Sequence, residues 1–255
     1  MRRYLIILMM PCFVMLFGIC CLAGCEGSRH HLKKVRLNEV AHSIFYAPQY
    51  VAIEKGYFEK EGIKLELTTG FGADKTATAV ISGDADIAFM GPEATIYQFN
   101  QGNADYLINF AQLTQRAGNF VVSREKEDSF KWEDLKGKKV IGGRPGGMPE
   151  MVFEYVLKKH GMNPQKDINL VQNIDFANTS GAFVSGEADY TVEFEPAATL
   201  IEEQGAGYVV ASVGKESGYV PYTAYSVKKS YLETHKELLE AFTRAIEKGQ
   251  EYVNT

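Results

Sequence analysis

The chain contains the stretch Ser82-Gly83-Asp84-Ala85-Asp86, which is followed after five residues by Pro92-Glu93-Ala94-Thr95. Its second half repeats the pattern as Ser185-Gly186-Glu187-Ala188-Asp189, followed after six residues by Pro196-Ala197-Ala198-Thr199. Each copy predicts a helix ending at a glycine, an acidic turn, a short strand, and a helix that Pro opens at its first position. A chance match is the alternative, but the shared context favours a structural duplication and hence two similar lobes.

Short apolar runs alternate with helical patterns around both copies, which is typical of an α/β fold with largely parallel strands. We expect strands at Val35–Val40, Lys64–Thr69, Asp86–Met90, Lys138–Gly142, Tyr208–Val213 and Tyr222–Val227. We expect helices at Pro48–Lys55, Ala73–Ser82, Pro149–His160 and Lys236–Val253. The prediction is a two-lobed α/β protein, each lobe a mixed, mainly parallel sheet flanked by helices.

The predicted lobes divide the chain at two points. Residues 35–120 together with 218–255 form lobe one, and residues 121–217 form lobe two. Ligands of open α/β sheets bind at the carboxyl ends of the strands, so the predicted binding site is the cleft between the lobes. No stop signal follows the last helical pattern, which leaves open an extension beyond Thr255.

The first 25 residues are typical of a bacterial lipoprotein signal peptide. Arg2 and Arg3 precede an apolar run that ends in Leu22-Ala23-Gly24-Cys25, a lipobox-like tetrapeptide in which Cys25 receives the lipid. A transmembrane anchor is the alternative for a run of this length. Residues 26–34 then form a polar tether, and the expected location is extracytoplasmic, lipid-anchored to the cell membrane.

Cysteine usage and charge exclude several classes of function. All four cysteines lie at positions 12, 20, 21 and 25, so the body can form no internal disulfide, thiolate metal site or catalytic cysteine. Without Arg2 and Arg3 the chain has 25 basic against 32 acidic residues, a charge of −7. Nucleic acid is therefore not an expected partner, and we expect no metal and no cofactor.

Four stretches resemble the solute-binding proteins of ABC importers for alkanesulfonates, nitrate and thiamine-pyrimidine precursors. They are the segment from Tyr46 to Ile63, the segment from Ser82 to Ala88, the segment from Trp132 to Lys138, and Phe194-Glu195-Pro196. The resemblance implies a type II periplasmic-binding-protein fold, a monomer without catalytic residues, whose lobes close on a small solute and dock on a membrane permease.

Several residues are expected to bind the solute. The glycine-rich turn at Gly146, Gly147 and Met148 precedes a helix N-terminus, which favours an anion or a polar oxygen; a tight turn is the alternative. The resemblance places Glu195 where pyrimidine-binding relatives use a carboxylate, with helix capping as the alternative. Its counterparts in lobe one are Met90, Gly91 and Glu93, of which Glu93 is equally explained by the helix dipole. Further candidates are His42, Phe45, Tyr46 and Tyr222, whose rings suit a flat solute.

The solute itself is less well defined. Two acidic candidates and several aromatic residues favour a nitrogen heterocycle such as a thiamine-pyrimidine precursor over a sulfonate, taurine or nitrate anion. The Trp-x-Pro-Asn stretch of pyrimidine-precursor binders is absent, however, and Gly146-Gly147-Met148 stands where sulfonate binders have hydroxyl residues. Other classes to consider are a thiamine-pyrimidine synthase-like enzyme, whose cysteine-rich motif is missing, and a sensory lipoprotein.

Overall fold

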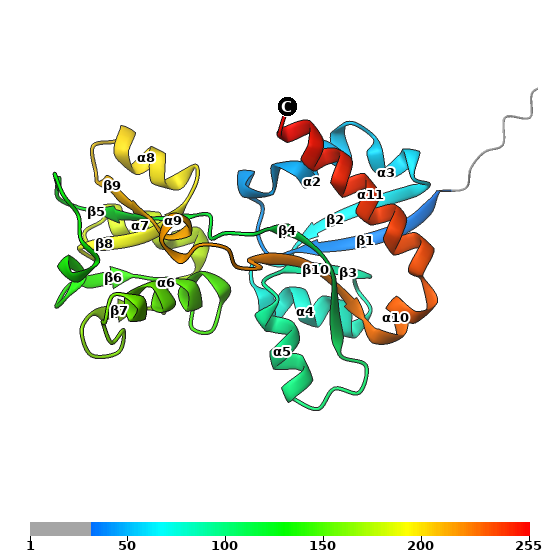
Figure 1. Cartoon of the computed structure of the whole chain (residues 1–255), viewed down its shortest axis with the longest axis horizontal. Coiled ribbons are helices and arrows are strands. Elements are labelled where there is room, and N and C mark those ends of the chain that lie inside the picture. The colour runs from blue at the N-terminus through cyan, green and yellow to red at the C-terminus, as the bar shows by residue number, and fades with distance from the viewer. Residues whose placement is uncertain (1–31) are drawn as a thin grey trace, which may run out of the picture. The chain divides into compact units, whose positions relative to one another are not determined.

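The computed structural model describes residues 32–255, and the chain forms one unit from Lys33 onward. The predicted signal peptide, its lipidation site Cys25 and residues 26–31 of the predicted tether lie outside the described residues. Figure 1 shows two sheets, each flanked by helices. Within residues 32–255, no helix combines the length and the apolar character needed to cross a membrane.

Each half of the body contains a five-stranded sheet, and the two sheets have the same design. The first has the order β2-β1-β3-β10-β4 and the second the order β7-β6-β8-β5-β9. In each, three parallel strands adjoin one antiparallel strand, β10 or β5, which pairs in turn with the edge strand. The predicted two-lobed α/β fold with mixed, mainly parallel sheets is thus confirmed. The bounds are β1 (Lys33–Glu39), β2 (Ile63–Thr69), β3 (Ile87–Met90), β4 (Leu107–Thr114), β10 (Thr223–Lys228), β5 (Asn119–Ser123), β6 (Lys139–Ile141), β7 (Asn169–Val171), β8 (Tyr190–Phe194) and β9 (Tyr208–Ser212).

The repeated sequence occupies equivalent places in the two lobes, because β3 and β8 are each the central strand of their sheet. The last acid of each copy makes the same contacts. Asp86 accepts a hydrogen bond from the backbone N–H of Arg36 at 2.8 Å, and Asp189 accepts one from the backbone N–H of Lys139 at 2.8 Å. The backbone N–H of each aspartate donates back to the same residue. The motif therefore fastens the central strand to its parallel neighbour.

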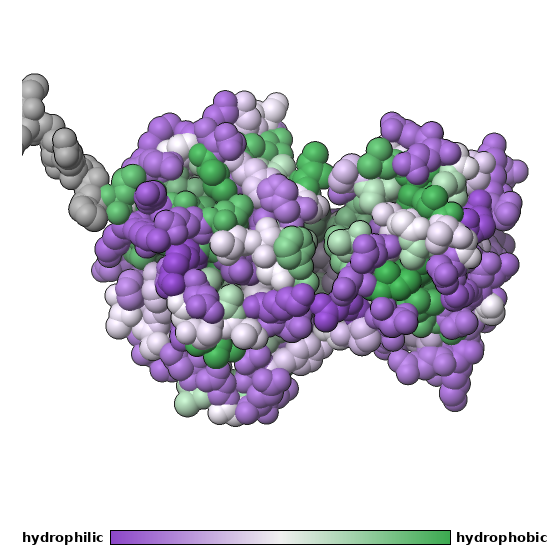
Figure 2. All heavy atoms as spheres, turned by 180° about the vertical axis from the view of Figure 1, so that it is seen from behind, coloured by the Kyte–Doolittle hydropathy of each residue, from purple (hydrophilic) through white to green (hydrophobic). Residues whose placement is uncertain are grey.

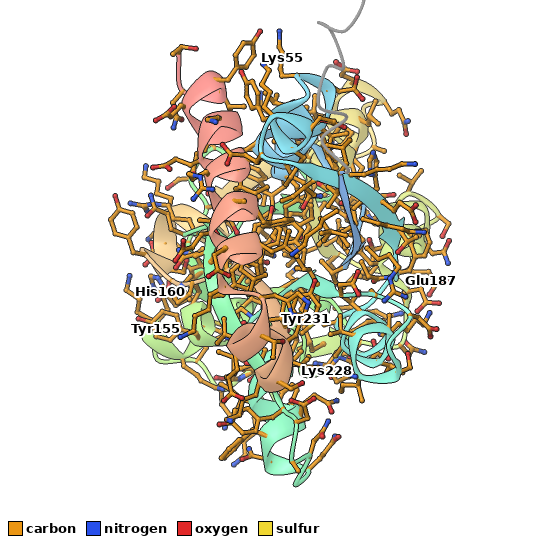
Figure 3. All side chains as sticks on the ribbon, turned by 90° about the vertical axis from the view of Figure 1, so that its right-hand side faces the viewer. Lys55, Tyr155, His160, Glu187, Lys228 and Tyr231 are labelled. Atoms are coloured by element: carbon orange, nitrogen blue, oxygen red, sulfur yellow. The ribbon has the colours of Figure 1, made fainter. Side chains whose placement is uncertain are left out.

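Helices cover both sheets and enclose the cores. In the first lobe these are η1 (Ile44–Tyr46), α2 (Ala47–Glu54), α3 (Tyr57–Lys60), α4 (Ala73–Ser82), α5 (Glu93–Asn100), α10 (Lys229–Thr234) and α11 (Lys236–Val253). In the second they are η2 (Trp132–Leu135), α6 (Met148–Lys159), η3 (Phe176–Asn178), α7 (Thr179–Val184), α8 (Ala197–Glu203) and α9 (Val213–Ser217). Helix α11 buries Phe242 against Phe58 and Tyr225. Figure 3 shows it running along the first lobe, with Tyr231 on the preceding α10.

The chain crosses between the two sheets twice, from β4 to β5 and from α9 to β10. The two crossings lie side by side, since Val220 N–H donates to Gln115 O and Tyr222 N–H donates to Thr114 O, each at 3.0 Å. The expected start of lobe two at Val121 lies inside β5, whose first residue, Asn119, already pairs with Phe194.

Strand β1 begins earlier than the sequence pattern indicates. Lys33 and Lys34, which we placed in the tether, pair with Ile63 and Lys64 of β2. Their side chains are exposed, so the polar pattern at the start of this strand is indistinguishable from that of a linker.

Candidate functional site

A cavity of about 720 Å³ lies between the lobes at the carboxyl ends of the strands. Residues that follow β1, β3 and β6 line it, as does Phe194 at the end of β8. This is the position at which open α/β sheets bind ligands, and the volume is typical of a site for a small molecule. Figure 2 shows, from behind, the surface hollowed between the two halves.

A smaller cavity of about 100 Å³, called here the inner cavity, adjoins the cleft cavity and shares Glu93, Gly147 and Phe194 with it. Aromatic rings form much of its wall. The ring centroid of Phe45 lies 5.6 Å from that of Phe194 and 5.7 Å from that of Tyr222. Phe45 comes from the first lobe and Phe194 from the second, so their contact lies where the two lobes meet.

Among the carboxylates of residues 32–255, Glu93 alone lines both cavities, and its side chain connects the lobes. It stands in the first turn of α5 and is 4% exposed. Its Oε1 accepts a hydrogen bond of 3.0 Å from the backbone N–H of Met148, the first residue of α6 in the other lobe. Its Oε2 is buried and has no hydrogen-bond partner among residues 32–255. Burial raises the pKa of Glu93 to about 7, because the charged form loses its hydration.

Gly91 makes room for this carboxylate. A Cβ atom built on Gly91 would lie 2.1 Å from Glu93 Oε2 and 2.6 Å from Glu93 Oε1. Any side chain at position 91 would therefore push the carboxylate away from Met148. Gly91 itself lines the inner cavity.

Two further contacts cross the cleft near its rim. The hydroxyl of Tyr97 on α5 donates to the carbonyl of Gly146 at 3.0 Å, and Asp74 Oδ1 lies 3.5 Å from Arg144 Nη1. Together with the bond from Met148 to Glu93 they hold α4 and α5 of the first lobe against the turn before α6. Such contacts can form only while the lobes are together, so they contribute to the closed form.

His42 and Tyr46 support the first-lobe wall. The Nδ1 of His42 lies 2.9 Å from Oε1 of Glu39, a fully buried carboxylate that also accepts hydrogen bonds from Gln49, Tyr50 and Thr69. The imidazole is itself exposed and lines the cleft cavity. Tyr46 packs its ring edge-on against Phe89, with centroids 4.5 Å apart, and lines the inner cavity.

Most of the residues expected in the site line one of the two cavities. His42, Gly146 and Gly147 line the cleft cavity, Glu93 and Gly147 line both, and the inner cavity is lined by Phe45, Tyr46, Gly91, Met148 and Tyr222. Met90 and Glu195 line neither. Met90 is fully buried with Ala88 in a core cluster, because alternation along β3 turns these two side chains away from Phe89 and Ile87.

Glu195 makes a local contact instead. Its Oε2 accepts a hydrogen bond of 3.1 Å from the backbone N–H of Thr199 in the first turn of α8. This corresponds to the helix-capping interpretation of Glu195, which we considered beside the ligand role. A carboxylate at this place satisfies one of the free N–H groups at a helix start.

Several cavity residues were missed by sequence reasoning, among them Phe71, Asp74, Tyr97, Arg144 and Phe176. Of these residues, Phe71 has the features that most clearly mark a functional site. It is 67% exposed although large and apolar, and it has a φ of 56°, a backbone conformation that side chains rarely adopt. Strained residues gather at functional sites, but nothing in the sequence around Gly70-Phe71-Gly72 distinguishes this loop from an ordinary turn.

Two other buried carboxyl groups lie in the second lobe. Burial raises the pKa of Glu193 to about 7, against hydrogen bonds from Thr191 and Thr179 that lower it. Burial also raises the pKa of Glu150 to about 7, with Glu154 as the next cause. Thr179 lines the cleft cavity, so Glu193 orients a residue of the cavity wall from behind.

Comparisons with known proteins agree with this architecture. The chain is 50% identical over 242 residues to the protein of Bacillus subtilis (strain 168) named "Putative binding protein YtlA", and the match covers 95% of this chain and 72% of that protein. Among solved structures, it resembles the periplasmic aliphatic sulphonate binding protein SsuA from Escherichia coli, with a TM-score of 0.70 and 17% identity over 85% of this chain and 72% of that one.

It also resembles the periplasmic nitrate-binding protein NrtA from Synechocystis PCC 6803, with a TM-score of 0.69 and 19% identity over 88% of this chain and 63% of that one. At these identities the two structures establish the fold, which is that of the periplasmic binding proteins. The NMT1/THI5-like family model matches residues 44–255. The match begins after β1, includes all the other strands of both sheets and covers well over half of the chain, and the chain therefore belongs to the NMT1/THI5-like family.

Proposed function

We propose that this protein binds a small organic solute in the cleft between its lobes and delivers it to the permease of an ABC importer. The observation that carries the proposal is the cavity of about 720 Å³, which residues from both lobes line at the carboxyl ends of their strands. A solute held there contacts both lobes and so favours the closed form over the open one. The permease can then distinguish loaded from empty protein by its shape.

Features of the sequence support the proposed cellular setting. The lipobox-like segment ending at Cys25 and the resemblance to importer binding proteins support an extracytoplasmic monomer, lipid-anchored to the cell membrane. SsuA and NrtA, which share the fold, are named as periplasmic proteins. The matched relatives carry the names of binding proteins rather than enzymes, which supports a role in transport.

A flat nitrogen heterocycle with N–H groups is the solute class that the cavity fits best. Phe71, Phe176 and Phe194 provide apolar ring surfaces along the cavity wall, which suit a planar solute. Glu93 provides a buried acceptor oxygen without a partner. A solute that donates an N–H group to this oxygen would remove the cost of leaving it unpaired.

An anion such as a sulfonate or nitrate is the alternative, supported by Arg144 and Lys75 in the cavity wall. Arg144 already faces Asp74, however, and the acids Glu93, Asp74 and Asp175 outnumber these two bases in the wall. A fixed excess of carboxylates repels an anionic solute.

A thermal-shift screen followed by calorimetry tests the proposal. The compounds are thiamine-pyrimidine precursors, flavins, alkanesulfonates and nitrate. A ligand present at a hundred times its Kd stabilises the folded state by about 2.7 kcal/mol, which raises Tm by about 5–10 °C for a protein of this size. Stabilisation by sulfonates or nitrate alone would contradict the heterocycle proposal and support an anion as the solute.

The place of binding is tested with a matched pair of variants. Phe176 lines the cleft cavity, whereas Phe99 is similarly exposed but lies on α5 outside both cavities. Phe176→Ala should weaken the bound compound about tenfold, as loss of an aromatic contact does, and Phe99→Ala should leave its affinity unchanged. Equal effects of the two variants would place the solute outside the cleft.

A further inference from the structure

The N-terminus of α6 favours an anion, and a carboxylate of the protein itself lies there. Helix α6 has twelve residues, so its free N–H groups and dipole attract negative charge. The carboxylate found there belongs to Glu93, which reaches the backbone N–H of Met148 from the other lobe. The two residues are 55 positions apart in the chain, so this is a contact between lobes and not a local helix cap.

The second oxygen of this carboxylate is a candidate to accept a hydrogen bond from a ligand. Glu93 is 4% exposed and lines both cavities, and its Oε2 has no hydrogen-bond partner in the part of the chain that the structure describes. The hydroxyl of Tyr222, in the wall of the inner cavity, is also buried without a partner. Two unpaired polar atoms on residues that line the inner cavity are costly unless a bound group satisfies them.

We propose that Glu93 determines which class of solute the cleft accepts: it takes the place of an anionic group at the α6 N-terminus and offers its free oxygen to an N–H donor. The inference rests on the proposed function and specifies its solute class. An anionic solute would have to displace or approach the carboxylate, whereas a donor solute adds a hydrogen bond to it.

The magnitude of this selection follows from charge. Two like charges 4 Å apart near a protein surface repel enough to lower affinity roughly a hundred- to a thousandfold. A hydrogen bond to a charged acceptor raises affinity roughly ten- to a hundredfold. One carboxylate can therefore separate donor solutes from anions by several orders of magnitude.

Gly91 leaves the space that the Glu93 carboxylate occupies. Because a Cβ at position 91 would collide with both oxygens of Glu93, Gly91→Ala should displace the carboxylate while leaving its charge in the chain. The backbone at Gly91 is outside the left-handed region that only glycine tolerates, so alanine is compatible with the fold there.

The test compares wild type, Glu93→Ala, Glu93→Gln and Gly91→Ala at pH 8 by calorimetry. The probes are 4-aminopyrimidine, pyrimidine as its matched compound without the amino group, methanesulfonate and nitrate. We expect wild type to prefer 4-aminopyrimidine over pyrimidine and to reject both anions. Glu93→Ala should bind methanesulfonate or nitrate at least tenfold better than wild type, and all three variants should lose at least tenfold in affinity for 4-aminopyrimidine.

Glu195→Gln is the matched control, since Glu195 lines neither cavity; it should behave as wild type. Glu93→Gln, which is isosteric, keeps the experiment decisive if Glu93→Ala does not fold. Two results would overturn the inference and leave solute binding intact. One is an affinity in the cleft that changes neither with the amino group of the probe nor with the Glu93 variants. The other is an affinity of wild type for the anions that equals the affinity of Glu93→Ala. If neither wild type nor any variant bound any probe or any compound of the wider screen, both the proposed function and the inference would be overturned.

Discussion

Replacing Glu93 by Gln should make the protein less sensitive to alkaline pH, so that the stability of the variant relative to wild type rises from acidic to alkaline pH. Burial raises the pKa of Glu93 from 4.5 to about 7 in the folded state. A carboxyl whose folded pKa is raised binds its proton more tightly when folded, so stability is lost as pH rises between these two values. Glutamine carries no charge and keeps a carbonyl oxygen for the Met148 N–H, so the variant escapes this loss.

The size of the effect follows from the two pKa values. The raised pKa of Glu93 lowers the stability of wild type by roughly 1 kcal/mol at pH 5, where only the unfolded chain ionises, and by roughly 3 kcal/mol at pH 8, since each pKa unit corresponds to about 1.36 kcal/mol. The advantage of Glu93→Gln should therefore grow by roughly 2 kcal/mol between the two pH values. For a body of this size that is a growth of about 4–8 °C in the difference between the two Tm values.

Calorimetric melting of both proteins at pH 5, 6, 7 and 8 measures this growth. The pH dependence is the robust quantity, because an unpaired amide NH2 in the variant lowers its stability equally at every pH. Other titrating groups are present in both proteins and largely cancel. Glu66→Gln, at an exposed ion pair with Lys34, is the control and should show no such growth. A constant difference between Glu93→Gln and wild type across pH 5–8 would refute a buried carboxyl with a raised pKa.

Three further outcomes are expected. Tyr97→Phe removes the hydrogen bond to Gly146 across the cleft and should weaken solute binding about two- to tenfold by calorimetry, as loss of one neutral hydrogen bond does; unchanged affinity would mean that this contact does not contribute to closure. Asp189→Ala should cost roughly 1–3 kcal/mol in urea unfolding. Asp86→Ala should cost more, because Asp86 also pairs with the Arg36 guanidinium at 2.6 Å, and a neutral result for either would contradict the shared role of the motif. Glu195→Gln should leave solute affinity unchanged, since its carboxylate caps α8; weaker binding would restore it to the site.

The fold was predictable because the repeated motif contains residues that end one helix and start the next. The glycine that ends one helix and the proline that opens the next are local signals, whereas the hydrogen bond of Asp86 to Arg36 joins residues 50 positions apart and was not predictable from the motif. The order of the local signals fixes a strand-to-helix unit, and two copies fix two lobes. The exact start of β1 was not predictable, because Lys33 and Lys34 are exposed strand residues whose polarity resembles that of a linker.

The site was predictable only as far as local rules reach. Residues directly after strands β1, β3 and β6 were expected in the cleft and line the cavities there. Met90 was misplaced because alternation within a strand buried on both faces cannot be assigned a side from the sequence. Phe71 and Phe176 lie on loops whose position depends on packing between elements far apart in the chain.

Glu93 shows where local reasoning ends. An acid in the first turn of a helix is fully explained by the helix dipole, and only the assembled lobes bring it to the N-terminus of a different helix. The repeat sharpens the point, since the residue after Pro is Glu93 in one copy and Ala197 in the other. We propose that an anionic solute must compete with this tethered carboxylate, whereas a donor solute uses it. Under the proposed selection, one residue in one of two similar lobes sets the class of solute without any change of fold.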